Sequence, residues 1–130
     1  MRIGVPKEIK LDEYRVGLTP ASVREYVSRG HRVMIERSAG LGIGASDDIY
    51  RSAGAAIVDT PGEIFATADM VVKVKEPQAT EWRQLREGQI LFTFLHLAPD
   101  SDQAKGLLAS GCTAIAYETV TDASGGLPLL

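Results

Sequence analysis

Ile90-Leu91-Phe92-Thr93-Phe94-Leu95-His96 is an apolar run of strand length that ends in a histidine. Such a run indicates a buried strand over residues 90–95. A second run, Met70-Val71-Val72-Lys73-Val74-Lys75, also changes from apolar to charged at its carboxyl end. In open α/β sheets, ligands bind just beyond the carboxyl ends of the strands. The two strand ends therefore predict a crevice that contains His96 and at least one lysine.

Helix signals alternate with apolar runs along the chain. Thr19-Pro20 provides an N-cap with proline at the first helical position, and Gly30 is placed to end that helix. Thr60-Pro61-Gly62-Glu63 provides a second start of the same kind. The expected strands are residues 3–5, 32–36, 55–58, 70–75, 90–95 and 112–117, and the expected helices cover residues 20–30, 46–54, 60–68, 80–86 and 99–111. Leu107 and Leu108 are both expected on the inner face of the last helix. This alternation predicts a three-layer α/β fold, with a mostly parallel sheet, helices on both faces and a Rossmann-like or flavodoxin-like arrangement.

A glycine-rich segment formally matches a dinucleotide-binding fingerprint, Gly40-x-Gly42-x-x-Ala45. The fingerprint needs its first glycine directly at a strand end and a long helix directly after its last position. Here residues 37–39 intervene, and the helix expected from Ser46 is short because Gly54 follows. We therefore interpret residues 38–45 as a glycine-rich connection, with a nucleotide site as the less favoured alternative.

Composition narrows the class of protein. The 130 residues are 45% hydrophobic, enough for one domain with a continuous core. Fourteen basic against seventeen acidic residues give a net charge of -3 without a basic stripe, so we expect no nucleic acid partner. No window approaches the ~20 apolar residues of a membrane span, and we expect neither a membrane nor a metal site. The single Cys112 lies in an apolar run, which predicts a buried thiol in a reducing, cytoplasmic compartment.

His96 is the first candidate for chemistry, because an imidazole gives and takes a proton near neutral pH. A structural histidine bonded to a backbone carbonyl explains its position equally well. Lys73 and Lys75 are expected on one face of their strand, where surface lysines are the commoner case. Lys75 is the better functional candidate because it lies nearer the strand end, and Lys73 is expected to be set deeper.

Arg15 follows the first expected strand, in a charged loop over residues 6–15. Its guanidinium is suited to binding a carboxylate with two parallel hydrogen bonds, although a lone loop arginine is usually just solvated. For Lys7 and Glu8, an exposed ion pair is favoured over an inner support for the loop. A titratable histidine and cations at separate strand ends together predict a pocket for a small acid, with proton transfer next to its carboxylate.

Five motifs then occur in order along the whole chain: Met1-Arg2-Ile3-Gly4-Val5-Pro6-Lys7-Glu8, Arg15-Val16, Val72-Lys73-Val74-Lys75-Glu76-Pro77, Phe94-Leu95-His96-Leu97-Ala98 and Ala114-Ile115-Ala116-Tyr117-Glu118-Thr119-Val120. Together they resemble the N-terminal part of alanine dehydrogenase, in the alanine dehydrogenase and nicotinamide nucleotide transhydrogenase N-terminal family. The transhydrogenases have a related N-terminal part but lack the histidine of Leu95-His96-Leu97. That histidine favours the alanine dehydrogenases.

The resemblance implies an enzyme that interconverts L-alanine with pyruvate and ammonia, using NAD. It implies a substrate domain, a separate Rossmann domain and a homo-oligomer, a hexamer in this family. Carried over position by position, Arg15 and Lys75 hold the substrate carboxylate and carbonyl oxygen, and His96 is the catalytic acid/base. It assigns no cofactor-binding residue to these 130 positions.

Residues 125–130 are largely apolar and finish without a polar cap, so we expect the sequence to be cut from a longer protein. By the resemblance, residues 1–130 are an incomplete N-terminal substrate domain, and the NAD-binding domain is absent. We expect this polypeptide alone to bind NAD poorly, to be inactive, and to self-associate through uncovered apolar surface. A transhydrogenase-like subunit and a non-catalytic module that binds a small acid are the alternative hypotheses.

Overall fold

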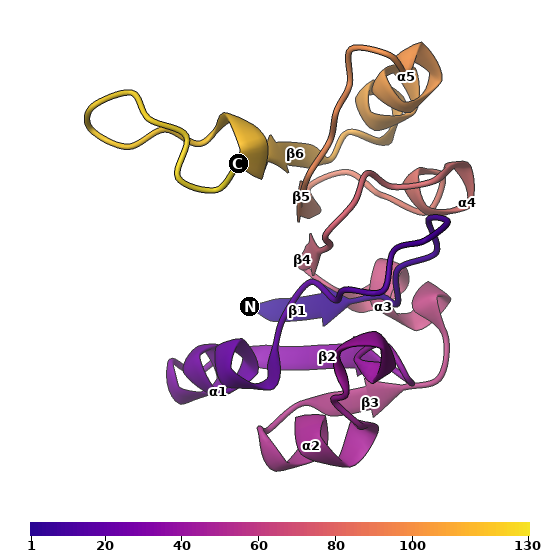
Figure 1. Cartoon of the computed structure of the whole chain (residues 1–130). Helices are drawn as coiled ribbons and strands as arrows, with labels where there is room; N and C mark the ends of the chain where they lie inside the picture. Colours follow the sequence, from indigo (N-terminus) through magenta and orange to yellow (C-terminus); the bar gives the residue numbers. More distant parts are fainter.

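The computed structural model describes all of residues 1–130, and Figure 1 shows one sheet with helices packed against it. The sheet has six strands in the order β3-β2-β1-β4-β5-β6, and every neighbouring pair is parallel. The strands are β1 (Arg2–Val5), β2 (Arg32–Glu36), β3 (Ala56–Val58), β4 (Met70–Val72), β5 (Ile90–Thr93) and β6 (Thr113–Ala116). The helices are α1 (Pro20–Ser28), α2 (Asp47–Ser52), α3 (Pro61–Thr67), α4 (Ala79–Trp82) and α5 (Ser101–Ser110), with 3-10 turns η1 (Leu41–Ile43) and η2 (Tyr117–Thr119). The predicted α/β fold is confirmed, and the strand order is the Rossmann one.

Successive residues of β1 pack against helices on opposite faces of the sheet. Ile3 and Val5 belong to a core cluster with Val23 of α1 and Tyr50 of α2. Gly4, between them, faces α3, where an added Cβ would collide with Ile64. Because side chains alternate across a strand, this pattern places helices on both faces, as predicted.

The predicted helix starts are confirmed. Thr19 accepts a hydrogen bond from the Ser22 amide at the start of α1, and Thr60 accepts one from the Glu63 amide at the start of α3. In each helix the proline after the cap occupies the first turn, where its missing amide hydrogen costs nothing.

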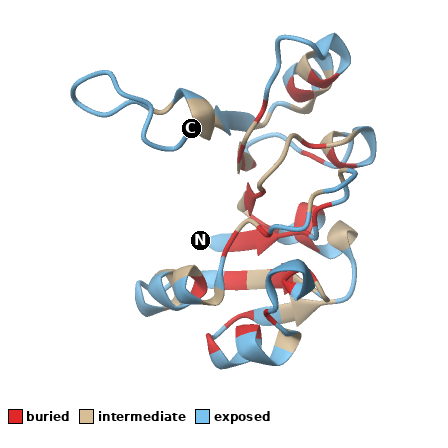
Figure 2. Cartoon of the chain, in the orientation of Figure 1, coloured by how far each residue is buried: buried red, intermediate tan, exposed pale blue.

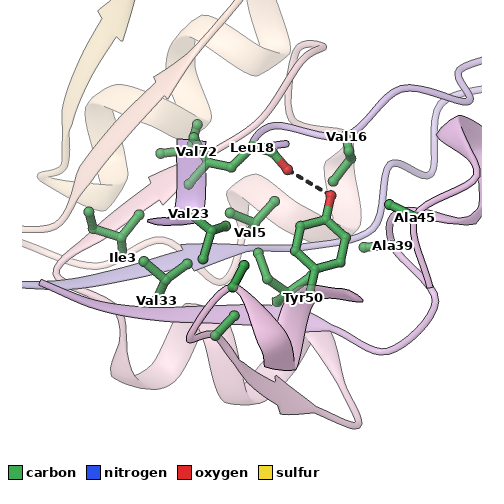
Figure 3. Packing of buried hydrophobic residues seen from close by; sticks show 13 residues of the cluster. Ile3, Val5, Val16, Leu18, Val23, Val33, Ala39, Ala45, Tyr50 and Val72 are labelled. Carbon is green, nitrogen blue, oxygen red and sulfur yellow. Dashed lines mark hydrogen bonds between the residues drawn. The ribbon is translucent and has the colours of Figure 1, made fainter. Parts of the chain in front are cut away.

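The buried Tyr50 fixes the end of the chain segment that follows β1. Its hydroxyl donates to the Leu18 carbonyl at 2.8 Å, and Figure 3 shows the ring pointing into the core toward Leu18. Burial raises the pKa of this phenol. The segment between β1 and α1 is therefore anchored where it returns to the core.

Four strands, β3 to β6, are shorter than predicted, and in β4 and β5 side chains replace strand partners. β4 ends at Val72, since the Val74 amide donates to the Glu8 carboxylate at 2.7 Å. β5 ends at Thr93, since the backbone amides of Leu95 and His96 donate to the Glu118 carboxylate. Lys73, Lys75 and His96 thus lie beyond the strands, in the loops at their carboxyl ends.

Three smaller expectations were wrong. Leu107 is 7% exposed and Leu108 is 83% exposed, because neighbouring residues of a helix point about 100° apart and cannot both face the core. Cys112 is half-buried, where a buried thiol was predicted. α4 ends at Trp82, short of the predicted residue 86.

The glycine-rich segment is a connection, as we interpreted it. Its 3-10 turn η1 leads into α2, a helix of only six residues. Gly42 packs so closely on the Tyr14 carbonyl that a Cβ there would overlap it. The glycine therefore serves a close approach of two backbone segments.

Burial is uneven across the sheet. Figure 2 shows buried residues in β1 and β2, whereas β6 and the tail after it are mostly exposed. None of the helices has the length and apolar character that a membrane span requires.

Candidate active site

The site lies where the chain direction across the sheet reverses. β1 and β4 are neighbours at the centre of the sheet, with β2 and β3 on one side and β5 and β6 on the other. In open α/β sheets a ligand site is expected beyond the strand ends at such a point. The loop after β1 crosses to the loop after β4, where Lys10 and Glu76 form an ion pair. Arg15 lies in the first of these loops and Lys75 in the second.

The loop after β1 is held against β4 by buried charges. Lys73 donates to Glu8 at 3.0 Å and contacts Glu81 at 2.9 Å, and its side chain is 1% exposed. Burial raises the pKa of Glu81, and the positive charge of Lys73 opposes that shift. The expectation of a surface lysine was wrong for Lys73, although it is set deeper than Lys75, as expected.

Glu8 is the inner support of this loop, and the favoured prediction of an exposed pair with Lys7 was wrong. Its carboxylate bonds both the Lys73 ammonium and the Val74 amide. Lys7 is fixed separately, because its backbone amide donates to Glu36 at 2.7 Å. The start of the loop after β1 is therefore fixed to the end of β4.

Arg15 extends from this loop and is held by the buried carboxylate of Glu13. Its Nε and Nη2 donate to the two carboxylate oxygens of Glu13 at 2.8 and 2.7 Å. The Arg15 side chain is 62% exposed, whereas that of Glu13 is 6% exposed. These hydrogen bonds lower the pKa of Glu13 to about 2, and the charge of Lys75 adds to the effect.

Lys75 and His96 meet at the ring of Phe94. The Lys75 ammonium lies 4.9 Å from the ring centroid, and the His96 imidazole stacks on the ring at 5.5 Å with an interplanar angle of 14°. None of the nine ion pairs of the chain includes Lys75, so its charge is not neutralised as that of Lys73 is. The predicted meeting of two strand ends is present in the structure.

His96 has an unusual backbone. Its φ is 45°, in the left-handed region, and its amide donates to Glu118 at 2.9 Å. The residue is exposed, so its ring can exchange protons with solvent or a bound molecule.

Arg15 belongs to the same electrostatic environment. Burial raises the pKa of Tyr117, and the positive charge of Arg15 opposes that shift. A hollow lined by residues 7–15, 38, 39, 41 and 42 contains Glu13 and Arg15, but it does not include Lys75 or His96. The three candidates thus do not line one cavity: Lys75 and His96 share the Phe94 ring, and Arg15 lies in the separate hollow.

Sequence reasoning missed the groups that fix these candidates. Glu13 anchors Arg15, Phe94 carries both Lys75 and His96, and Tyr117 and Glu118 contact the loops after β4 and β5. Tyr117 and Glu118 directly follow β6, so the rule that favoured residues at strand ends could have found them. In chemical terms, Arg15 and Lys75 are cations of the kind that bind a small anion, and His96 is an exposed titratable ring.

Comparison with known proteins supports a specific family. The model of the family described as "Alanine dehydrogenase/PNT, N-terminal domain" matches residues 4–130. This chain belongs to the alanine dehydrogenase/PNT family. The alanine dehydrogenase of Methanococcus maripaludis is 55% identical over 130 residues, which are 100% of this chain and 35% of that protein. That of Mycobacterium tuberculosis strain H37Rv is 52% identical over the same shares.

Solved structures of this family agree. An L-alanine dehydrogenase matches with a TM-score of 0.95 and 49% identity, over 98% of this chain and 35% of that one. A transhydrogenase from Sinorhizobium meliloti matches with a TM-score of 0.88 and 27% identity, over 95% of this chain and 37% of that one. The similarity to alanine dehydrogenases is therefore the stronger one. The chain spans about a third of the length of the relatives it matches.

Proposed function

We propose that the protein to which this chain belongs is an NAD-dependent L-alanine dehydrogenase, which reversibly converts L-alanine to pyruvate and ammonia. Residues 1–130 form the N-terminal part of its substrate domain, and the NAD-binding domain lies outside them. The observation that carries the proposal is the convergence of Lys75 and His96 on Phe94. The charge of Arg15 acts on Tyr117, whose ring packs against the same phenylalanine. Identities of 52% and 55% to alanine dehydrogenases over the whole chain support it.

The substrate is held by two cations, Arg15 and Lys75. Arg15 uses one edge of its guanidinium for Glu13, and the remaining Nη1 edge is available to the substrate carboxylate. Lys75 binds the carbonyl oxygen of pyruvate, where its charge stabilises the negative charge that develops on that oxygen. Stacking over Phe94 keeps the ammonium at the strand end without neutralising it.

His96 carries the protons. When alanine is oxidised, its Cα becomes an imine carbon to which water adds, and ammonia is then expelled. The imidazole takes the proton of that water and returns one to the leaving nitrogen, because histidine exchanges protons near neutral pH.

NAD supplies the hydride acceptor when it is bound. The glycine-rich segment does not fit the cofactor phosphates, because Gly40 is packed against Tyr50 and Gly42 against Tyr14. We therefore assign the cofactor to the part of the protein outside this chain. The proposal includes a reducing, cytoplasmic setting, in accord with the lone Cys112, and a homo-oligomer, a hexamer by family resemblance.

The test is alanine-dependent formation of NADH by the protein expressed from its complete reading frame. We expect activity in the parent and its loss in His96→Ala, with an exposed-residue control, Lys105→Ala, unaffected. An inactive parent would refute the dehydrogenase. In that case, alanine-independent reduction of an NAD analogue by NADPH would indicate the transhydrogenase alternative, and binding of pyruvate without turnover would indicate a small-acid module.

A further inference from the structure

We propose that Tyr117 and Glu118 are positioning residues that hold Lys75 and His96 at a fixed separation. The inference rests on the proposed function. It assigns a role to η2, the single 3-10 turn that follows β6, at the same edge of the sheet as the two candidate groups.

Glu118 fixes the backbone that carries His96. Its carboxylate accepts the Leu95 amide at 3.0 Å and the His96 amide at 2.9 Å. Two amides that converge on one carboxylate make charge-assisted hydrogen bonds, which are stronger than neutral ones. This clamp compensates for the positive φ of His96, a conformation that costs free energy in any residue with a Cβ.

Tyr117 fixes the backbone that carries Lys75. Its hydroxyl donates to the Val74 carbonyl at 2.7 Å, one residue before Lys75. The Thr93 hydroxyl donates to the Lys75 carbonyl at 2.8 Å, so the peptide groups before and after the Lys75 Cα are both held. The Tyr117 ring also packs against Phe94 at 6.2 Å, the ring that Lys75 and His96 share.

The register of the sheet explains how two consecutive residues reach two different loops. Ala116 is paired with Thr93 at the ends of β6 and β5. The chain then turns tightly, and the Thr119 hydroxyl donates back to the Ala116 carbonyl at 2.8 Å. From this turn Tyr117 reaches the loop after β4, and Glu118 reaches the loop after β5.

Neither residue is assigned a contact with substrate, so their effect is exerted through Lys75 and His96. Glu118 acts on the acid/base group, whose displacement lowers turnover. Tyr117 acts on the cation, whose displacement weakens pyruvate binding. The two substitutions therefore change different kinetic constants, which a general loss of stability would not do.

The experiment compares three variants of the full-length protein in reductive amination of pyruvate. We expect Glu118→Gln to lower kcat ~10-fold or more with little change in KM, because a small misplacement of a catalytic group costs up to ~10²-fold. We expect Tyr117→Phe, which keeps the ring and loses the hydroxyl, to raise the KM for pyruvate several-fold with kcat nearly unchanged. Thr119→Val removes a hydrogen bond from the same turn and is the matched control, with both constants unchanged.

Glu118→Asp provides a second variant should Glu118→Gln fail to fold. This variant keeps the negative charge on a shorter side chain. If both variants fold, we expect its kcat to lie between those of the parent and Glu118→Gln. If only Glu118→Asp folds, we expect its kcat to be lower than that of the parent. The inference is overturned if the Tyr117 and Glu118 variants show the kinetic constants of Thr119→Val while only their melting temperatures fall. An inactive parent would instead refute the proposed function, so the two failures are distinguishable.

Discussion

Arg15 binds Glu13 through one edge of its guanidinium only. Nε and Nη2 donate to the two carboxylate oxygens, and Nη1 makes no hydrogen bond within the chain. The carboxylate is buried and the guanidinium is exposed, so the acid is the anchor and the cation is the free arm. The edge formed by Nε and Nη2 therefore fixes the orientation of the guanidinium, and Nη1 remains available to a ligand.

The ion pair between Arg15 and Glu13 makes the free energy of unfolding depend on pH. The pKa of Glu13 is lowered from 4.5 to about 2, so its folded pKa lies below its unfolded one. The stabilisation is then complete above the unfolded value and is lost as the pH falls toward about 2. We expect the urea midpoint of the parent to exceed that of Glu13→Gln at neutral pH, and this difference to shrink on acidification. A difference that keeps the same size between neutral and acid pH would contradict the prediction.

The geometry of Arg15 also predicts that lysine cannot replace it. A lysine ammonium can contact two carboxylates, as Lys73 does, but it lacks the planar edges that give each carboxylate two parallel hydrogen bonds. We expect Arg15→Lys to raise the KM for pyruvate ~10-fold, corresponding to the loss of about one charge-assisted hydrogen bond. Arg51→Lys, at an exposed ion pair, is the control. An unchanged KM would show that Arg15 does not bind the substrate carboxylate.

Lys73 is expected to be critical for folding. Its removal would leave Glu8 and Glu81 buried without a cation, and breaking a buried pair in this way costs about 3–5 kcal/mol. We expect Lys73→Met to lower the melting temperature strongly, as measured by circular dichroism. Lys105→Met, which breaks the exposed pair with Asp102, should shift it little. Similar shifts in the two variants would contradict a structural role for the buried cluster.

Gly42 connects the glycine-rich segment to catalysis. A methyl group at this position would push against Tyr14, which directly precedes Arg15. We expect Gly42→Ala to lower kcat/KM for pyruvate ~10-fold by displacing Arg15. Gly62→Ala adds the same methyl group in α3, where the nearest atom is 3.8 Å away, and should leave kcat/KM unchanged. Equal kinetics for the two variants would show that the position of Tyr14 does not control Arg15.

The parts of the fold that depend on local chemistry were predictable. The cap at Thr19 and the glycine at position 30 bracket α1, and both signals lie within a few residues of the helix they set. The alternation of such helices with apolar strands was enough for the parallel sheet. Lys75 and His96 were found by their places after strands, and the structure brings them together.

The parts that depend on distant partners were not predictable. Lys73 resembles a surface lysine until Glu8 and Glu81 are placed around it, and no local pattern brings these three together. Glu118 contacts His96 only because Ala116 is paired with Thr93, and that register is a property of the sheet. Strand lengths were overestimated for the same reason, since acidic side chains took the place of strand partners.

The contact between Glu8 and Lys73 also sets an order of events during synthesis. The two residues are separated by 65 positions, so at roughly 5–20 residues per second the ribosome releases Lys73 about 3–13 s after Glu8. Until then the Glu8 carboxylate lacks its partner Lys73, and the loop that carries Arg15 is not yet held against β4. A nascent chain can thus complete β1, α1 and β2 early, whereas its anion-binding loop must wait for β4 to emerge.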